Sequence, residues 1–251
     1  MAENSRISWC THSWNTAVGC HSVSKGCTKC YARTLVENRM GKDFSAVTKT
    51  APATFRAPLK WAKKTPGARV FANSLSDFFL EEQDPWRAEA WDIIRQTPEL
   101  IYLILTKRPE RIAQNLPVAS GNRTTQHQDP TWPWQNVWLG VSVETQQYTS
   151  RMDVLRQVPV HGNQRFVSAE PLLGPLELDL AGFGWVITGG ESGPGHRPME
   201  PDWCRSIRDQ CKAAGVMYHH KQGSHLRPGM DTLLDGVEHR DVPTPEDRVD
   251  P

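Results

Sequence analysis

Hydrophobic residues follow two alternating patterns along the chain. Nearly continuous apolar runs occupy residues 69–73, 101–105, 137–143, 165–168, 185–188 and 216–220. Between several of these runs, apolar residues recur at helical spacing, in the stretches 86–96, 145–156 and 202–214. Strands buried on both faces have such continuous runs, and strands that alternate with helices form parallel sheets. The pattern therefore predicts an α/β protein with a parallel sheet that is covered by helices.

The number of these units favours a barrel. Six or seven βα units fit a complete or partial TIM-type (β/α) barrel better than a doubly wound sheet. We expect residues 1–222 to form this barrel, with a short first strand that leads into a cysteine loop at residues 20–30. Residues 223–251 form a C-terminal extension with a turn at Leu234-Asp235-Gly236 and a disordered end. Further helices are expected over residues 28–40, near Leu59-Lys60-Trp61 and from Pro109 onward, and a polar insertion covers residues 121–133.

Composition and charge narrow the class of protein. The chain is 38% hydrophobic and 23% charged, and no run approaches the roughly 20 apolar residues that span a bilayer. Because residues 1–6 have no apolar signal core, we expect a cytoplasmic protein without a membrane partner, whose thiols stay reduced. Residues 1–70 carry twelve Lys and Arg against three Asp and Glu, a balance of +9, while the remainder carries seventeen against twenty-five, or −8. This asymmetry indicates either a basic working surface or solvated loop lysines.

Three of the six cysteines lie within eleven residues, from Cys20 to Cys30. In a reducing compartment such a density predicts metal or cluster ligands rather than disulfides. A structural zinc ion needs four protein ligands; His21 is bonded directly to Cys20, so His12 or Cys10 would have to complete the set. Three thiolates with one open position instead suit an iron–sulfur cluster that leaves one iron free for a small molecule. The candidate ligands are Cys20, Cys27 and Cys30.

The other three cysteines are expected to have structural roles. Cys204 and Cys211 lie seven residues apart on one face of a predicted helix, and buried free cysteines commonly act as small apolar residues. Cys10 is expected to pack beside Trp9.

Polar side chains follow the predicted strands at one and the same end. In a parallel barrel the chemistry collects where the strands finish, and although a single Ser or Asp there is commonly a helix cap, the repetition indicates one polar mouth facing the cysteine loop. Glycines in residues 189–195 would let the backbone approach a ligand closely, yet they match neither the dinucleotide fingerprint nor a phosphate loop. The strand-end segments are Asn73–Asp77, Thr106–Arg108, Ser142–Thr145, Ser168–Pro171, Gly189–Gly193 and Lys221–Gln222.

Together these features resemble the radical SAM superfamily, in which a three-cysteine loop follows the first strand of a βα barrel. More narrowly, the chain is similar to a phage-encoded three-cysteine family of unassigned chemistry, distantly like the spore photoproduct lyase branch. The likeness covers about residues 7–222, but six residues rather than the usual three separate the first two cysteines. It rests on Trp14-Asn15, Cys30-Tyr31-Ala32, Ser76-Asp77, Leu105–Arg108, Gly140–Glu144, Ala169–Pro171 and Gly189–Gly193.

The resemblance implies a set of cofactors and ligands. The three loop cysteines would bind three irons of a [4Fe–4S] cluster, and the fourth iron would bind S-adenosylmethionine. One electron, from a reductase or a flavodoxin-type donor, would cleave S-adenosylmethionine to methionine and a 5′-deoxyadenosyl radical that abstracts hydrogen from a substrate. By position, Ser76 and Asp77 would contact the methionine amino group. The remaining candidates are Lys107, Ser142 and Glu144 for the carboxylate and ribose, and Gly189, Gly190 and Glu191 for the adenine side.

Three functions remain open at this point. The first is a radical SAM enzyme, in the host cytoplasm if phage-encoded, that acts on a base or nucleotide-linked group in DNA, RNA or a free nucleotide. The second is a radical SAM enzyme for a small metabolite or peptide, and the third is a non-catalytic zinc protein that binds nucleic acid. Colour separates the third from the others because iron–sulfur proteins are brown, and salt-sensitive nucleic-acid binding favours the first over the second.

Overall fold

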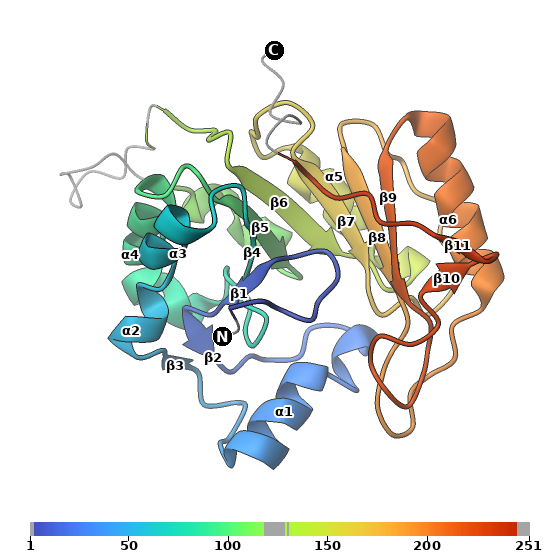
Figure 1. Cartoon of the computed structure of the whole chain (residues 1–251), viewed down its shortest axis with the longest axis horizontal. Coiled ribbons are helices and arrows are strands. Elements are labelled where there is room, and N and C mark those ends of the chain that lie inside the picture. The colour runs from blue at the N-terminus through green and yellow to red at the C-terminus, as the bar shows by residue number, and fades with distance from the viewer. Residues whose placement is uncertain (1–2, 118–128, 130, 245–251) are drawn as a thin grey trace.

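The computed structural model describes residues 3–117, 129 and 131–244. Its main sheet has seven strands in the order β1-β4-β5-β6-β7-β8-β9, all of them parallel to their neighbours, and it curls into a half-barrel (Figure 1). The sheet is open, with β1 and β9 at its edges, so the barrel is partial. The strands are β1 His12–Trp14, β4 Arg69–Ala72, β5 Ile101–Thr106, β6 Val137–Ser142, β7 Arg165–Ala169, β8 Trp185–Gly189 and β9 Met217–Gln222. The predicted parallel α/β architecture is confirmed.

Most helices pack on the outer, convex side of this sheet, whereas the helix over residues 31–40 packs against Phe44 and Leu75 in a separate cluster (Figure 1). Burial of one face explains their positions, since Ile94 of α4, Leu155 of α5 and Ile207 of α6 all belong to the larger hydrophobic core. The α-helices are α1 Tyr31–Met40, α2 Pro52–Phe55, α3 Pro58–Lys64, α4 Asp84–Arg95, α5 Ser150–Arg156 and α6 Pro201–Ala214. A small antiparallel pair, β2 Ala17–Val18 and β3 Thr48–Lys49, flanks the cysteine loop. None of the described helices is long and apolar enough to cross a membrane.

The helix predicted from Pro109 onward is wrong. Two short 3₁₀ turns occupy this stretch, η3 Pro109–Arg111 and η4 Ala113–Asn115. Leu116 is extended, with a φ of −65° and a ψ of 159°, as expected for the residue before a proline, so the chain cannot continue as a helix. The helix predicted over 145–156 is divided into a 3₁₀ turn, η5 Gln146–Tyr148, and α5. Most of the predicted polar insertion, and the predicted disordered end, lie outside the described residues.

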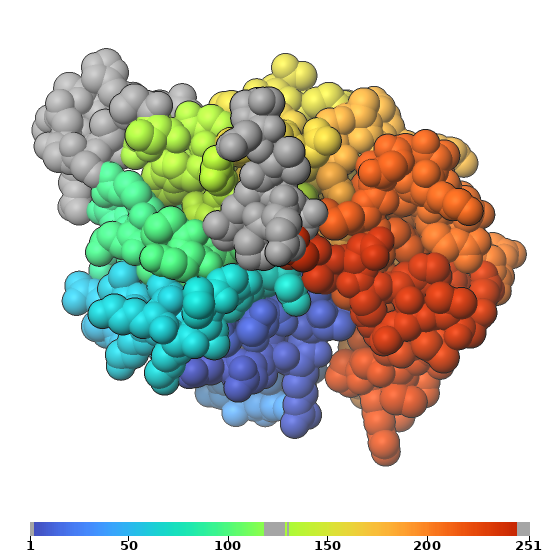
Figure 2. All heavy atoms as spheres, turned by 45° about the horizontal axis from the view of Figure 1, so that its top comes forward, coloured from blue at the N-terminus to red at the C-terminus, as the bar shows by residue number. Residues whose placement is uncertain are grey.

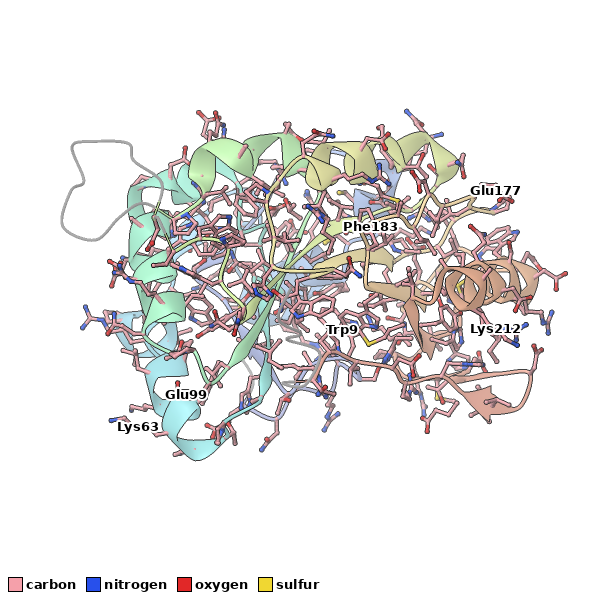
Figure 3. All side chains as sticks on the ribbon, turned by 90° about the horizontal axis from the view of Figure 1, so that it is seen from above. Trp9, Lys63, Glu99, Glu177, Phe183 and Lys212 are labelled. Atoms are coloured by element: carbon pink, nitrogen blue, oxygen red, sulfur yellow. The ribbon has the colours of Figure 1, made fainter. Side chains whose placement is uncertain are left out.

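The concave side of the sheet is sealed at the amino ends of its strands. Trp9 packs against Phe71 and Trp185, with ring centroids 4.5 Å and 6.1 Å away, and Figure 3 shows Trp9 deep inside the molecule. A Cβ at Gly140 would lie 2.4 Å from the Phe166 ring, so this glycine makes room for the aromatic cluster. As predicted, Cys10 belongs to the same buried cluster as Trp9. Cys204 and Cys211 are fully buried in the other core, which also confirms the prediction.

The C-terminal extension runs along the free edge of β9. The His220 backbone N–H donates to His239 O at 3.0 Å, and Trp185 Nε1 donates to Asp241 O at 2.9 Å. Arg240 Nη1 donates to Ser8 Oγ at 3.5 Å, and Figure 2 shows the N-terminal and C-terminal segments meeting on one face. The predicted turn is present between β10 Leu233–Leu234 and β11 Val237–Glu238. The extension therefore covers the exposed edge that an open parallel sheet would otherwise present.

Candidate functional site

A cavity of about 210 Å³ lies where the strands of the half-barrel end. Side chains from the ends of β4, β5, β6, β7, β8 and β9 line it, together with the cysteine loop at residues 20–30. This confirms that the polar strand ends form one mouth facing the cysteines. The candidate residues from the sequence that line it are Cys20, Cys27, Cys30, Ser76, Asp77, Lys107, Ser142, Gly190 and Glu191.

Two candidate residues, Glu144 and Gly189, are not among the side chains that line this cavity. Glu144 is fully buried behind the wall, where it accepts hydrogen bonds from Lys107 Nζ at 2.5 Å and Arg151 Nη1 at 2.9 Å. Burial acts to raise the pKa of Glu144, but the attraction of Lys107 and the hydrogen bonds outweigh it and lower the pKa. A Cβ at Gly189 would lie 2.7 Å from Glu170 Oε1, so Gly189 leaves room for that carboxylate. In this structure both residues position neighbouring side chains.

The cysteine loop is tied to the ends of several strands. Ser76 Oγ, after β4, donates to the backbone oxygen of Gly19 at 2.6 Å, just before the loop begins. Further contacts are Arg108 Nη2 to His21 O at 2.8 Å, Ser24 Oγ to Glu144 Oε1 at 2.6 Å, Arg197 Nη1 to Lys25 O at 3.0 Å, and Lys29 Nζ to Gly195 O. Because these partners come from the ends of β4, β5 and β6 and from the segment after β8, the loop is positioned by the sheet and its connections.

The loop thiols differ from one another electrostatically. All three are free and half-buried. Burial and the nearby Asp77 carboxylate raise the pKa of Cys20 to about 11, although Arg108 Nη1, 3.8 Å from the sulfur, acts in the opposite direction. Burial also acts to raise the pKa of Cys27, but hydrogen bonds from Val23 and Ser24 and the attraction of Lys107 outweigh it and lower the pKa. The surroundings of Cys27 therefore favour its thiolate form.

Asp77 and Glu191 hold cationic partners at the rim. Asp77 accepts hydrogen bonds from Thr106 Oγ1 at 2.7 Å, the Lys107 backbone N–H at 3.0 Å and Arg108 Nη1 at 3.1 Å. Glu191 is bound by the Arg197 guanidinium, whose Nε lies 3.0 Å from Glu191 Oε2, and this pairing lets Arg197 reach the cysteine loop. The two carboxylates thus anchor the arginines that fix the loop.

Sequence reasoning missed four residues that shape the site. Arg108, Glu170 and Lys221 belong to strand-end segments that it singled out, but it assigned them no role. Arg197 carried no signal, because its role depends on an ion pair with Glu191 and on a loop that lies far away in the sequence. Strand-end position was therefore the useful signal for three of the four.

The three loop thiols are the residues of this site that could hold a metal cluster. Within the described part of the chain, no group of three or more His, Cys, Asp or Glu side chains could hold a metal ion as it stands. In a [4Fe–4S] cluster the thiolates go to separate irons, so its ligands surround a volume and need not meet at one ion. The three free thiols line one cavity. His12, proposed as a fourth zinc ligand, instead stacks on Trp61 with ring centroids 4.6 Å apart and contacts Thr65 Oγ1 at 3.0 Å, and neither it nor Cys10 lines this cavity.

Comparison with known proteins gave one match. A family model described as a protein of unknown function (DUF5131) matches residues 4–243. No curated protein and no solved structure matches the chain. The matched range includes the whole half-barrel, the cysteine loop and nearly all of the described C-terminal extension.

Proposed function

Because the chain belongs to the DUF5131 family, whose description assigns no activity, we propose a function from the site itself: a radical SAM enzyme. The observation that carries the proposal is the placement of three free, half-buried thiols in one cavity with the polar ends of the parallel strands. Three protein thiolates leave one iron of a [4Fe–4S] cluster open, which is the arrangement that binding of S-adenosylmethionine requires.

Cys20, Cys27 and Cys30 would hold the cluster. When bound, the cluster and S-adenosylmethionine supply reductive cleavage of a carbon–sulfur bond and hydrogen abstraction from a substrate, with the electron coming from a reductase or flavodoxin-type donor. Lys107 and the hydrogen bonds to Cys27 favour its thiolate form, whereas at Cys20 burial and Asp77 outweigh the positive charge of Arg108. At Cys27 the chain thereby reduces the cost of placing negative charge in a half-buried site.

The strand ends opposite the thiols would bind S-adenosylmethionine. Lys107 is the candidate cation for its carboxylate, because Lys107 lines the cavity and Glu144 holds its ammonium. Ser76, Asp77 and Ser142 provide polar groups on the same wall, and Gly190 and Glu191 form the rim after β8. The aromatic cluster around Trp9 closes the other end of the barrel interior and would exclude water from the reacting atoms.

Cofactor binding is tested by anaerobic reconstitution with iron and sulfide. We expect a brown protein with about four irons per chain, whose reduced form gives an electron paramagnetic resonance signal that changes when S-adenosylmethionine is added. A colourless protein that carries stoichiometric zinc, or a cluster whose signal S-adenosylmethionine leaves unchanged, would reject the proposal.

A further inference from the structure

We propose that Glu170 and Lys221 bind the hydrogen-bonding edge of an unpaired nucleobase in this cavity. The base would be the substrate of the radical chemistry, so this assignment rests on the proposed function and names its substrate class. It is carried by an ion pair that lines the cavity, is not used by the cysteine loop and shares the cavity with aromatic side chains.

Glu170 follows β7 and Lys221 lies near the end of β9, and both side chains line the cavity. Lys221 Nζ lies 2.8 Å from Glu170 Oε1, and the two side chains are 25% and 13% exposed. Ser168 Oγ donates to the other carboxylate oxygen at 3.1 Å. The cavity wall therefore presents a hydrogen-bond donor directly beside an acceptor, with no net charge.

This pair has hydrogen-bonding capacity to spare. An ammonium offers three donors and a carboxylate about four acceptor sites. Within the described residues, Lys221 Nζ is paired with Glu170 alone, and Glu170 also accepts from Ser168. Glu144, by contrast, is bound by three separate side chains, from Ser24, Lys107 and Arg151, and lies outside the cavity lining. Glu144 has the contacts of a structural anchor, whereas the Glu170–Lys221 pair can accept a further partner from the cavity.

Apolar and aromatic side chains line the same cavity as this pair. Trp9 and Phe71 line the cavity and are otherwise buried, and Leu105 adds an aliphatic surface. Aromatic and apolar side chains on which a ring can stack, combined with polar groups that read its edge, are the means by which proteins hold a base taken out of its stack. Such stacking is available to every base because each has a π-face.

The charges of the pair select the ligand class. A phosphate or carboxylate would meet the repulsion of Glu170, and a simple cation would meet that of Lys221, so their neutral pair favours neither. A nucleobase edge carries an N–H donor beside a nitrogen or oxygen acceptor, and these match an adjacent carboxylate and ammonium. A flat, neutral, hydrogen-bonding ring is therefore the ligand that suits both the Glu170–Lys221 pair and the aromatic side chains of the cavity.

The test is calorimetric titration of the full-length protein with four probes: adenosine, guanosine, cytidine and uridine. We expect at least one nucleoside to bind, and Glu170→Gln and Lys221→Gln each to weaken its affinity at least tenfold. Glu89→Gln is the matched control, because Glu89, on α4, forms an ion pair with Lys49 at 2.6 Å and does not line the cavity. This substitution should leave nucleoside affinity unchanged. Inorganic phosphate, titrated alone, should not bind at this wall.

A charge swap separates recognition from a structural role. Glu170→Lys combined with Lys221→Glu preserves the ion pair but reverses the order of donor and acceptor. We expect the ranking of the four nucleosides to change in this double variant, whereas a purely structural pair would recover the wild-type ranking. Thermal unfolding of each variant is measured alongside. If Glu170→Gln fails to fold, Lys221→Gln and the charge-swapped double variant still test the assignment.

Failure of this assignment can be told apart from failure of the proposed function. The nucleobase site alone would be overturned if the wild-type holoenzyme cleaves S-adenosylmethionine but binds no nucleoside at millimolar concentration. The same conclusion would follow if it binds a nucleoside with an affinity that the Glu170 and Lys221 variants leave unchanged. Nucleoside binding that depends on both residues, in a reconstituted protein that does not cleave S-adenosylmethionine, would support the site and reject the radical mechanism.

Discussion

The two halves of the concave face of the sheet are built from the same strands but have opposite character. Along β7, Phe166 and Ser168 lie on the same face two residues apart, yet Phe166 belongs to the sealed aromatic cluster and Ser168 lines the cavity. β9 repeats the change from Met217, which packs against that cluster, to Lys221 in the cavity. Alternation along a strand decides which face a side chain takes, and distance from the end of the strand decides its chemistry.

The cysteines do not divide in this simple way, since burial and Asp77 raise the pKa of Cys20 to about 11 although Cys20 lines the cavity. Cys10 lies in the sealed half, where burial raises its pKa to about 11. Cys27 lies in the open half, and burial is again the largest influence on its pKa, but Ser24, Val23 and Lys107 reverse the outcome. Polar groups from the cysteine loop and from the end of β5 therefore lower the pKa of Cys27, and burial alone does not decide the pKa of a thiol here.

Replacing cysteines from the two halves should give the largest difference in effect. We expect Cys27→Ala to abolish cluster binding, because a [4Fe–4S] cluster with one open iron has no protein thiolate to spare. Cys211→Ala and Cys10→Ala should retain full iron content, since both thiols are buried outside the cavity. Iron per chain after anaerobic reconstitution is the measurement; equal iron loss in all three variants, or none in any, would refute the ligand assignment.

Truncation of the aromatic cluster should affect stability. Trp9→Ala removes a nearly fully buried indole from the sealed half and should lower the free energy of unfolding by about 3–5 kcal/mol. Ser142→Ala, in the open half of the same face, should cost less than about 1 kcal/mol. Urea titrations of the two variants give both values, and similar losses would show that the two halves do not differ as described.

A buried histidine should give the sealed half a dependence on pH. His219 is fully buried between Ser8, Arg240 and the Asp241 backbone oxygen, and burial lowers its pKa from 6.5 to about 4. The unfolded chain takes up this proton at a higher pH than the folded one, so the stabilisation is complete above about pH 6.5 and is lost as the pH falls toward 4. The loss should be about 3 kcal/mol.

The control for this effect is His219→Gln, which cannot titrate. Its free energy of unfolding should fall less steeply between pH 6.5 and 4 than that of the wild type, while acid-sensitive carboxylates elsewhere contribute equally to both. Parallel slopes for the two proteins over this interval would contradict the assignment.

The sequence predicted strands such as β5, β6 and β8 well because they are apolar runs, and it predicted the polar mouth because parallel strands end together. It failed from Pro109 onward, where two 3₁₀ turns replace the predicted helix and Leu116, before Pro117, is extended. It could not place Glu144, since whether a carboxylate beyond a strand end points into the cavity or behind its wall depends on Lys107 and Arg151 from other elements. Long-range partners, unlike periodicity, leave no mark on the local sequence.

The most direct test of the central claim is to incubate the reconstituted protein with dithionite and S-adenosylmethionine without oxygen, and to measure 5′-deoxyadenosine by chromatography. We predict its formation by the wild type and by Cys211→Ala, and its absence with Cys27→Ala. A wild-type protein that contains its full complement of iron and binds S-adenosylmethionine, yet yields no 5′-deoxyadenosine either alone or with any of the four nucleosides, would contradict the account.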